Sequence, residues 1–206
     1  MCTGKCAKFI GYALYPLVVI SLIANIIEFF PGWETQPISN PSDQMTPEVL
    51  FMGGIIGSGI LVLIPAIHIQ ATGREEGCCN NRCGMFLSII FAAIGVAGSV
   101  YGFAASVVGM VKGPVCQFLL KNETYPQGIL TWGRPFDTDL AQFSNESYLF
   151  NQTAWNTCEY PKDVVLFNVV LFSIVLSTSA ISLVLCAIQM VNGLFGCCCG
   201  TCGDKK

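Results

Sequence analysis

At Val164–Val191 the chain reads VVLFNVVLFSIVLSTSAISLVLCAIQMV, a stretch without a charged residue. About 20 apolar residues in a helix cross the roughly 30 Å of hydrocarbon in a bilayer, so this stretch is long enough to span a membrane. Three further windows are also long and apolar enough: 9–30, 49–71 and 85–111. Their only charged residue is Glu28. Helices buried in a soluble bundle would carry polar faces, and these windows do not. The sequence therefore predicts an all-α integral membrane protein with a bundle of four transmembrane helices.

The composition argues against several functional classes. Hydrophobic residues make up 53% of the 206 residues and charged residues 11%, whereas soluble domains carry about 25% charged residues. The net charge of −3 gives no attraction for nucleic acid. With one histidine and no nucleophile, metalloprotease or phosphate-loop motif, we expect no enzyme and no cofactor. The window 9–30 exceeds a signal-peptide core and lacks a cleavage site, which predicts a retained signal anchor.

The segments between the windows differ in charge. One side of the membrane would hold residues 1–8, 72–84 and 192–206, which carry six of the ten basic residues. The other side would hold the short loop 31–48, which has no basic residue, and the large loop 112–163. Lys and Arg concentrate on the cytosolic side of membrane proteins, so we expect both termini in the cytosol and both of these loops outside.

The large loop 112–163 has the features of a folded extracellular subdomain. It contains every N-x-S/T sequon of the chain, at Asn122, Asn145 and Asn151, which are the predicted N-glycosylation sites. Its aromatic residues are too numerous for a disordered linker. We expect a small packed unit with short helices around Asp139–Asn156.

Two of the 12 cysteines, Cys116 and Cys158, lie in the large loop. In an oxidising compartment this pair predicts a disulfide that bridges the subdomain between the third and fourth helices. The chain-entropy model gives such a bridge a contribution of roughly 4 kcal/mol. An intermolecular bridge and two free thiols are the alternatives.

Nine cysteines lie just outside the windows on the expected cytosolic side, where reducing conditions disfavour disulfides. Juxtamembrane cysteines accept palmitoyl groups because the acyl chain can enter the bilayer there. The candidate sites are Cys2, Cys6, Cys78, Cys79, Cys83, Cys197, Cys198, Cys199 and Cys202. Zinc binding by Cys79, Cys83, Cys199 and Cys202 is the alternative, because their two pairs have ligand-compatible spacing.

Small residues recur at four-residue spacing in two windows, as Gly53-x3-Gly57 and Gly98-x3-Gly102. Small faces let helix backbones approach closely where no hydrophobic effect drives association. We expect these glycines to pack inside the bundle. Contact with a partner helix, including that of a second copy in a homo-oligomer, is the alternative.

Several segments together resemble the transmembrane 4 L-six antigen family, which has a tetraspanin-like topology. They are Met1–Ala7, Phe29–Thr35, Gly53–Gly59, Lys112–Cys116, Leu171–Ser173 and Ile188–Gly193. True tetraspanins differ because their large loop carries a Cys-Cys-Gly and at least four cysteines. The chain also departs from close L-six relatives, since Phe167 stands where a tryptophan is frequent and no sequon follows at Asn168.

The resemblance implies an acylated, glycosylated organiser of the plasma membrane. Such proteins associate laterally with membrane lipids and with integrins, receptors or tetraspanins, and influence adhesion, migration and proliferation. A small-molecule or lipid carrier with a cavity between the helices is one alternative, and an auxiliary subunit of a channel or receptor is another. The membranes of the endoplasmic reticulum, the Golgi apparatus or endosomes are the alternative locations.

Overall fold

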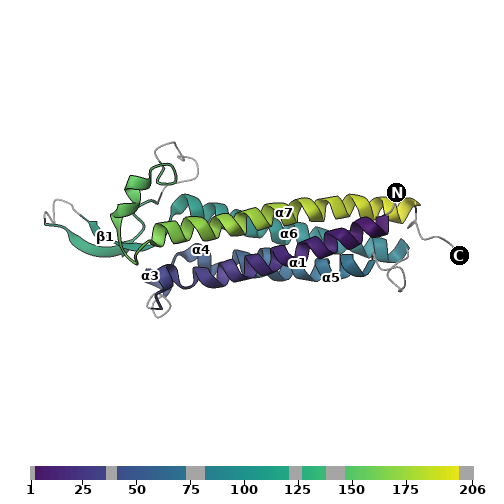
Figure 1. Cartoon of the computed structure of the whole chain (residues 1–206), viewed down its shortest axis with the longest axis horizontal. Helices are drawn as coiled ribbons and strands as arrows, with labels where there is room; N and C mark the ends of the chain where they lie inside the picture. The colour runs from purple at the N-terminus through teal and green to yellow at the C-terminus, as the bar shows by residue number, and fades with distance from the viewer. Residues whose placement is uncertain (1–2, 36–40, 73–81, 121–126, 138–146, 200–206) are drawn as a thin grey trace.

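The computed structural model describes residues 3–35, 41–72, 82–120, 127–137 and 147–199. It is an elongated helical bundle with a small sheet at one end (Figure 1). Four helical segments are long and apolar enough to cross a membrane: Gly4–Glu28, Pro47–Thr72, Cys83–Lys112 and Val164–Cys197. The prediction of a four-span, all-α membrane protein is confirmed.

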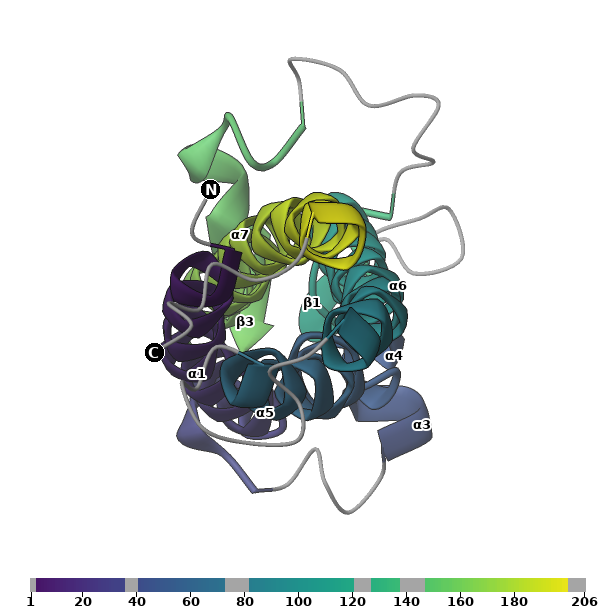
Figure 2. The same ribbon diagram turned by 90° about the vertical axis from the view of Figure 1, so that its right-hand side faces the viewer.

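The four spans form a ring around a common axis (Figure 2). The first is α1 (Thr3–Glu28), the third is α6 (Arg82–Lys112) and the fourth is α7 (Val164–Cys199). α7 contacts both α1 and α6, and α5 (Leu61–Thr72), the main helix of the second span, closes the ring between them. α1 begins and α7 ends at the end of the bundle opposite the sheet (Figure 1). We call these two ends the terminal end and the sheet end.

The second span is not one continuous α-helix. It consists of α4 (Pro47–Leu50), a π-helical segment η2 (Gly53–Ile60) and α5. Met52, between the first two, has a left-handed backbone with φ of 48° and ψ of 42°. The η2 segment reads GGIIGSGI, and glycine is a poor former of regular α-helix because its backbone is so free. The 49–71 window predicted the span but not this break.

The interior of the ring is mainly apolar, although buried Ser, Thr, Asn and Gln side chains also lie within it. Its main cluster of buried residues comes from all four spans: Ala7, Ile10, Leu14, Val18, Val62, Ala66, Ile69, Ala92 and Cys186. Large apolar side chains also cover the outside of the spans, for example Phe9, Ile67 and Val184. A bundle that is apolar on both its inner and outer surfaces is suited to hydrocarbon rather than water.

The sheet lies between α6 and α7 in the chain. It contains β1 (Cys116–Leu120), β2 (Ile129–Gly133) and β3 (Cys158–Tyr160) in the antiparallel order β2-β1-β3. The 3₁₀-helix η4 (Gln152–Thr157) falls within the range where short helices were expected, and residues 139–146 of that range lie outside the described residues. The strands were not predicted, because each has only three to five residues, too few for a clear alternating pattern.

Two small helical elements complete the sheet end. They are η1 (Pro31–Trp33), directly after α1, and α3 (Pro41–Gln44), directly before α4. Trp33 packs edge-on against Phe167 of α7, with ring centroids 5.9 Å apart. η1 therefore lies where the first loop meets the start of the fourth span, and α3 lies beside β2.

Candidate functional site

A disulfide joins the first and third strands of the sheet. The Cα atoms of Cys116 and Cys158 are 5.6 Å apart, and Cys116 is fully buried. β1 and β3 are antiparallel neighbours with an irregular register at Gln117 and Phe118. The predicted bridge is confirmed, so neither the intermolecular bridge nor the pair of free thiols applies.

A satellite core holds the sheet to the bundle. Cys116, Tyr148, Val164 and Val165 form a buried cluster. The ring of Tyr148 stacks on Phe136 with centroids 4.6 Å apart.

Hydrogen bonds reinforce this core around Tyr148. Its hydroxyl donates to the backbone oxygen of Met110 in α6, and its own backbone oxygen accepts from Trp155 Nε1 at 2.8 Å. Burial raises the pKa of Tyr148 well above its usual range, so this hydroxyl stays a donor at physiological pH. The Tyr148 side chain therefore anchors the segment between β2 and β3 to the sheet end of the third span.

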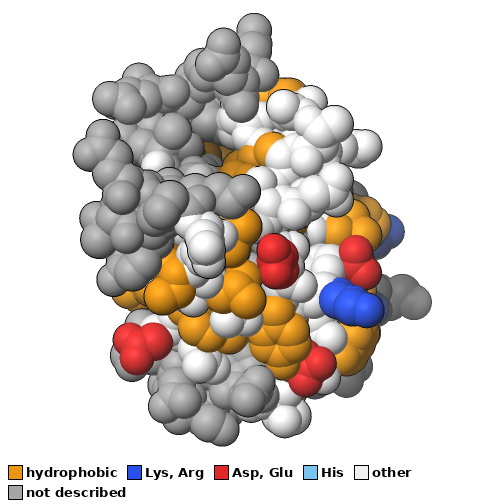
Figure 3. Space-filling view, turned by 90° about the vertical axis from the view of Figure 1, so that its left-hand side faces the viewer, with side chains coloured by type: hydrophobic (Ala, Val, Ile, Leu, Met, Phe, Trp, Pro, Cys, Tyr) orange, Lys and Arg blue, Asp and Glu red, His pale blue; other side chains and the backbone are white. Residues whose placement is uncertain are grey.

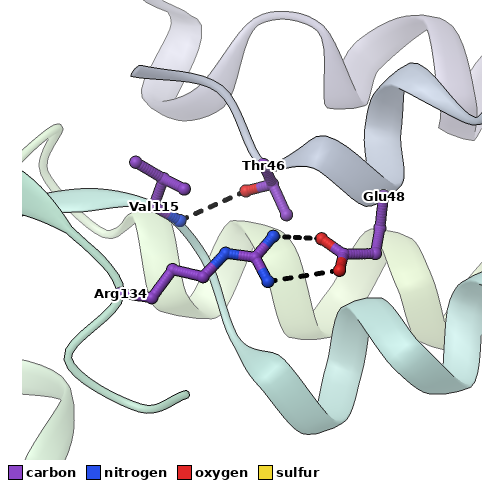
Figure 4. Close-up of polar contacts among 4 residues, drawn as sticks. All are labelled: Thr46, Glu48, Val115 and Arg134. Atoms are coloured by element: carbon purple, nitrogen blue, oxygen red, sulfur yellow. Dashed lines mark hydrogen bonds and ion pairs between the residues drawn. The ribbon is translucent and has the colours of Figure 1, made fainter. Parts of the chain in front are cut away.

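A second anchor is an ion pair between the sheet and the second span (Figure 4). Arg134, just after β2, donates from Nη1 to Glu48 Oε1 at 3.2 Å and from Nη2 to Glu48 Oε2. The two side chains are only 13% and 5% exposed. Beside the pair, the backbone N–H of Val115 donates to Thr46 Oγ1 at 3.2 Å. We call the Arg134–Glu48 pair and the Thr46–Val115 hydrogen bond the clamp.

Sequence reasoning missed the clamp. Glu48 and Arg134 were counted only as loop charges, and their 86-residue separation leaves no local pattern. The available signal was weak. Arg134 is a basic residue in the large loop of a protein with few charges, which could have prompted a search for an acidic partner.

The paired strands β1 and β2 end in exposed apolar residues. Leu119 pairs with Leu130, and Leu120 pairs with Ile129. All four side chains are between 38% and 47% exposed. We call these four residues the hairpin tip. Apolar side chains also gather across the middle of the sheet end, with acidic and basic groups around them (Figure 3). Large exposed apolar groups outside the spans are characteristic of interaction surfaces.

Of the three predicted glycosylation sites, the structure describes one. Asn151 is exposed and precedes η4, where its Oδ1 accepts from the backbone N–H of Thr153 at 3.1 Å. Its sequon is therefore on the surface, as an acceptor must be. Asn122 and Asn145 lie outside the described residues.

Of the nine candidate palmitoylation sites, the five cysteines in described segments lie at the terminal end of the bundle. Cys6 and Cys197 are half-buried and Cys83 is exposed. Cys198 and Cys199 are in the last turn of α7, and their side chains are not described. Cys2, Cys78, Cys79 and Cys202 lie outside the described residues.

The zinc alternative has four proposed ligands, Cys79, Cys83, Cys199 and Cys202. Of its four ligands, only the side chain of Cys83 is described. Among the described residues, no three His, Cys, Asp or Glu side chains are grouped closely enough to hold a metal ion. Zinc binding at the terminal end thus stays an alternative hypothesis.

The four glycines of the small-residue motifs face one another inside the bundle. A Cβ on Gly57 of η2 would lie 2.8 Å from Gly102 N and 2.8 Å from Gly98 O of α6. A Cβ on Gly53 would lie 2.8 Å from Ala105 Cβ. The backbones of the second and third spans thus touch, and the contact is within one chain.

A short chain of polar side chains connects α1 to η2. Ser21 Oγ donates to Gly54 O at 3.2 Å, and the N–H of Ile55 donates to Asn25 Oδ1 at 2.9 Å. Asn25 Nδ2 in turn donates to Glu28 Oε2 at 2.5 Å. These contacts satisfy backbone groups that the π-helical geometry exposes, as the interior of a membrane requires.

A carrier would need polar residues of the spans, such as Asn25, Ser99 or Ser177, to line one cavity, and these three do not converge. Asn25 and Ser99 are buried within the ring, whereas Ser177 is exposed on the outside of α7. They therefore line no common cavity, and the carrier hypothesis gains nothing from them.

Comparison with known proteins identifies relatives along the whole chain. The family model described as "L6 membrane protein" matches residues 1–203. The protein named transmembrane 4 L6 family member 4 of Mus musculus is 43% identical over 209 residues, covering 98% of this chain and 94% of its own length. Member 5 of Bos taurus is 38% identical, covering 100% and 98%. Member 1 of Homo sapiens is 35% identical, covering 98% and 96%. No solved structure shows significant similarity.

Proposed function

Because the chain belongs to the L6 membrane protein family and spans the membrane four times, we propose that it is a non-enzymatic scaffold of the plasma membrane. It associates laterally with adhesion or signalling receptors, among them integrins and tetraspanins, and with membrane lipids. Through these contacts it influences adhesion, migration or proliferation. Both termini lie in the cytosol, and the sheet end faces the outside of the cell.

The observation that carries this proposal is a rigidly mounted apolar surface. The hairpin tip projects at the end of a sheet held by the Cys116–Cys158 bridge, the Tyr148 core and the clamp. A pre-organised surface loses little conformational entropy when a partner docks, so more of the apolar contact is available for affinity. A surface of four side chains fits the small, transient or lateral class of contact.

The terminal end supplies the second half of the proposal. Cys6, Cys83 and Cys197 lie at the ends of α1, α6 and α7, where an attached acyl chain would enter the bilayer directly. Several acyl chains would increase affinity for ordered lipid and place the bundle beside proteins sorted in the same way. N-glycans at Asn122, Asn145 and Asn151 would shield the parts of the large loop that partners do not contact.

Crosslinking on intact cells followed by mass spectrometry tests the proposal. The wild-type chain is compared with a Leu119→Ser/Leu130→Ser variant, which removes half of the hairpin tip while leaving the strand pairing intact. Phe150→Ser is the matched control, since Phe150 is exposed in the same loop but lies outside the hairpin. We expect the double variant to reach the cell surface and to lose crosslinked receptors, while the control keeps them.

The outcomes separate the competing functions. Unchanged partners in the double variant would contradict recognition by the hairpin tip. A single channel or receptor recovered in fixed stoichiometry would indicate an auxiliary subunit instead. Crosslinks between two copies of the chain would show a homo-oligomer formed through the same surface.

A further inference from the structure

A small cavity lies at the sheet end where residues from four parts of the chain meet. Its polar lining comes from Glu28, the last residue of α1, Gln44, the last residue of α3, Thr46, directly before α4, and Asn168, in the second turn of α7. The cavity has a volume of about 20 Å³. A space of at least about 10–15 Å³ on this measure admits one water-sized species. The cavity can therefore hold one small ion and nothing as large as an organic ligand.

Three oxygen atoms in this lining are buried without a hydrogen-bond partner in the described chain. They are Glu28 Oε1, Gln44 Oε1 and Asn168 Oδ1. The side chains of Glu28 and Asn168 are only 5% and 7% exposed. Buried oxygen acceptors are nearly always satisfied, because burial removes the water that would otherwise bind them. Three unsatisfied acceptors around one cavity point to a ligand that accepts electron pairs from oxygen.

The charge of the site specifies the sign of that ligand. Of the described residues that line the cavity, only Glu28 is charged. Asn25 donates a hydrogen bond to Glu28 Oε2 but brings no charge. The negative end of α1 and the positive end of α7 both reach the cavity and offset each other. The nearby Arg134 is already paired with Glu48. When Glu28 is ionised, its negative charge thus has no counter-charge among the described residues that line the cavity, and a buried lone carboxylate is costly.

We propose that this cavity binds one monovalent alkali cation of about the size of Na⁺, held by Glu28 Oε1, Gln44 Oε1 and Asn168 Oδ1. Carboxylate and amide oxygens are the ligands that hard cations prefer. A single positive charge neutralises Glu28 and leaves the site without net charge. Ca²⁺ would leave one uncompensated positive charge buried in the cavity, so the single charge of Glu28 selects a monovalent ion.

The cation would join segments that are far apart in the sequence. It connects the end of α1, the start of the second span through Gln44, and the start of α7. Thr46 and Val115 of the clamp also line the cavity, and Glu48 of the clamp directly precedes the lining residue Val49. Binding therefore stabilises the base on which the sheet is mounted, whatever partner the sheet recognises.

Direct binding to the purified wild-type protein is the first test. The protein in detergent or nanodiscs is equilibrated with ²²Na⁺ in choline chloride buffer, because choline is too large for the cavity. We expect saturable binding of about one ion per chain that unlabelled NaCl displaces and choline chloride does not. Absence of saturable binding would overturn the proposal, and would show that Glu28 is protonated or bonded to water instead.

Thermal unfolding of variants is the second test. Replacing choline chloride by NaCl at constant ionic strength should raise the Tm of the wild-type protein by about 2–4 °C, since only the folded state has the site. Glu28→Gln keeps the size and the acceptor for Asn25 but removes the charge, and should abolish the rise. The matched control Glu159→Gln, at an exposed acidic residue of β3, should keep it.

A third variant covers the case in which Glu28→Gln does not fold. Asn168→Asp adds a second carboxylate to the cavity without changing its size. The site would then carry two negative charges, and we expect Ca²⁺ to raise the Tm more than Na⁺ does. An equal Na⁺ response in all these proteins, or no Ca²⁺ response in Asn168→Asp, contradicts a cation site at this place.

Discussion

Arg134 and Glu48, 86 positions apart in the chain, form a two-pronged ion pair that ties the sheet to the second span. Each of the two terminal guanidinium nitrogens donates to one carboxylate oxygen, and both side chains are largely buried. A bidentate pair of this kind fixes orientation as well as distance, because the planar guanidinium matches the carboxylate. The sheet is thus held at a set angle to the bundle.

Breaking the clamp should destabilise the protein markedly. Glu48→Gln leaves Arg134 buried without a counter-charge, and we expect a loss of about 3 kcal/mol in the free energy of unfolding. The measurement is thermal unfolding of the purified protein, with Glu159→Gln as a surface control. The charge-swapped double variant Glu48→Arg/Arg134→Glu should recover part of the loss. Equal Tm values for wild type and Glu48→Gln would show that the pair contributes nothing.

Removing the disulfide should destabilise the sheet end without unfolding the helical bundle. Cys116→Ser/Cys158→Ser frees a long loop, and the chain-entropy model gives a loss of roughly 4 kcal/mol. On non-reducing gels the wild-type protein should migrate differently from its reduced form, while the double variant should show no such difference. Cys83→Ser, at an exposed free thiol, is the control and should behave as wild type.

Adding one methyl group between the second and third spans should be costly. In Gly57→Ala the new Cβ would meet the backbone of α6 at 2.8 Å, and backbone cannot move aside as a flexible side chain can. Overpacking of this kind costs about 1–3 kcal/mol. Gly4→Ala is the matched control, because no atom lies within 4 Å of its Cβ position. A Tm as high in Gly57→Ala as in Gly4→Ala would refute close packing at this position.

Replacing Asn25 should destabilise the protein, although this residue lies near the end of a span. Asn25→Leu removes the acceptor for the N–H of Ile55 and the donor to Glu28. A buried donor left unpaired costs about 1–3 kcal/mol, so the Tm should fall by several degrees. Ser177→Ala changes an exposed hydroxyl that bonds within its own helix, and should have little effect.

Acylation and zinc binding at the terminal end predict different chemistry for the same cysteines. We expect hydroxylamine to release several acyl groups from protein isolated from cells. A variant with the nine inner cysteines changed to serine should release none, although Cys186 remains. Stoichiometric zinc in the purified protein, lost in Cys202→Ser, would instead support the metal site.

The sequence was sufficient for the features that depend on composition along the chain. Four windows whose only charged residue is Glu28 require helices, because unpaired backbone groups cannot remain in hydrocarbon. The Cys116–Cys158 bridge was predictable because these are the two cysteines of the large loop. The four-residue spacing of Gly53 and Gly57, and of Gly98 and Gly102, predicted close helix packing, because small residues on one helix face let backbones approach each other.

Only the tertiary structure decided the features that join distant segments. The strand pairing, the clamp and the cavity around Glu28 depend on side chains that approach one another from separate elements, and no periodicity along the chain encodes such an approach. Glu28 shows the difference: in the sequence it is an acidic residue expected to reach water or a partner at the interface. In the fold, Asn25 donates a hydrogen bond to one of its oxygens, while the other is buried without a partner in a residue that lines the same cavity as Gln44 and Asn168. Composition determines that these segments lie in a membrane, whereas the packing of side chains determines which of them meet.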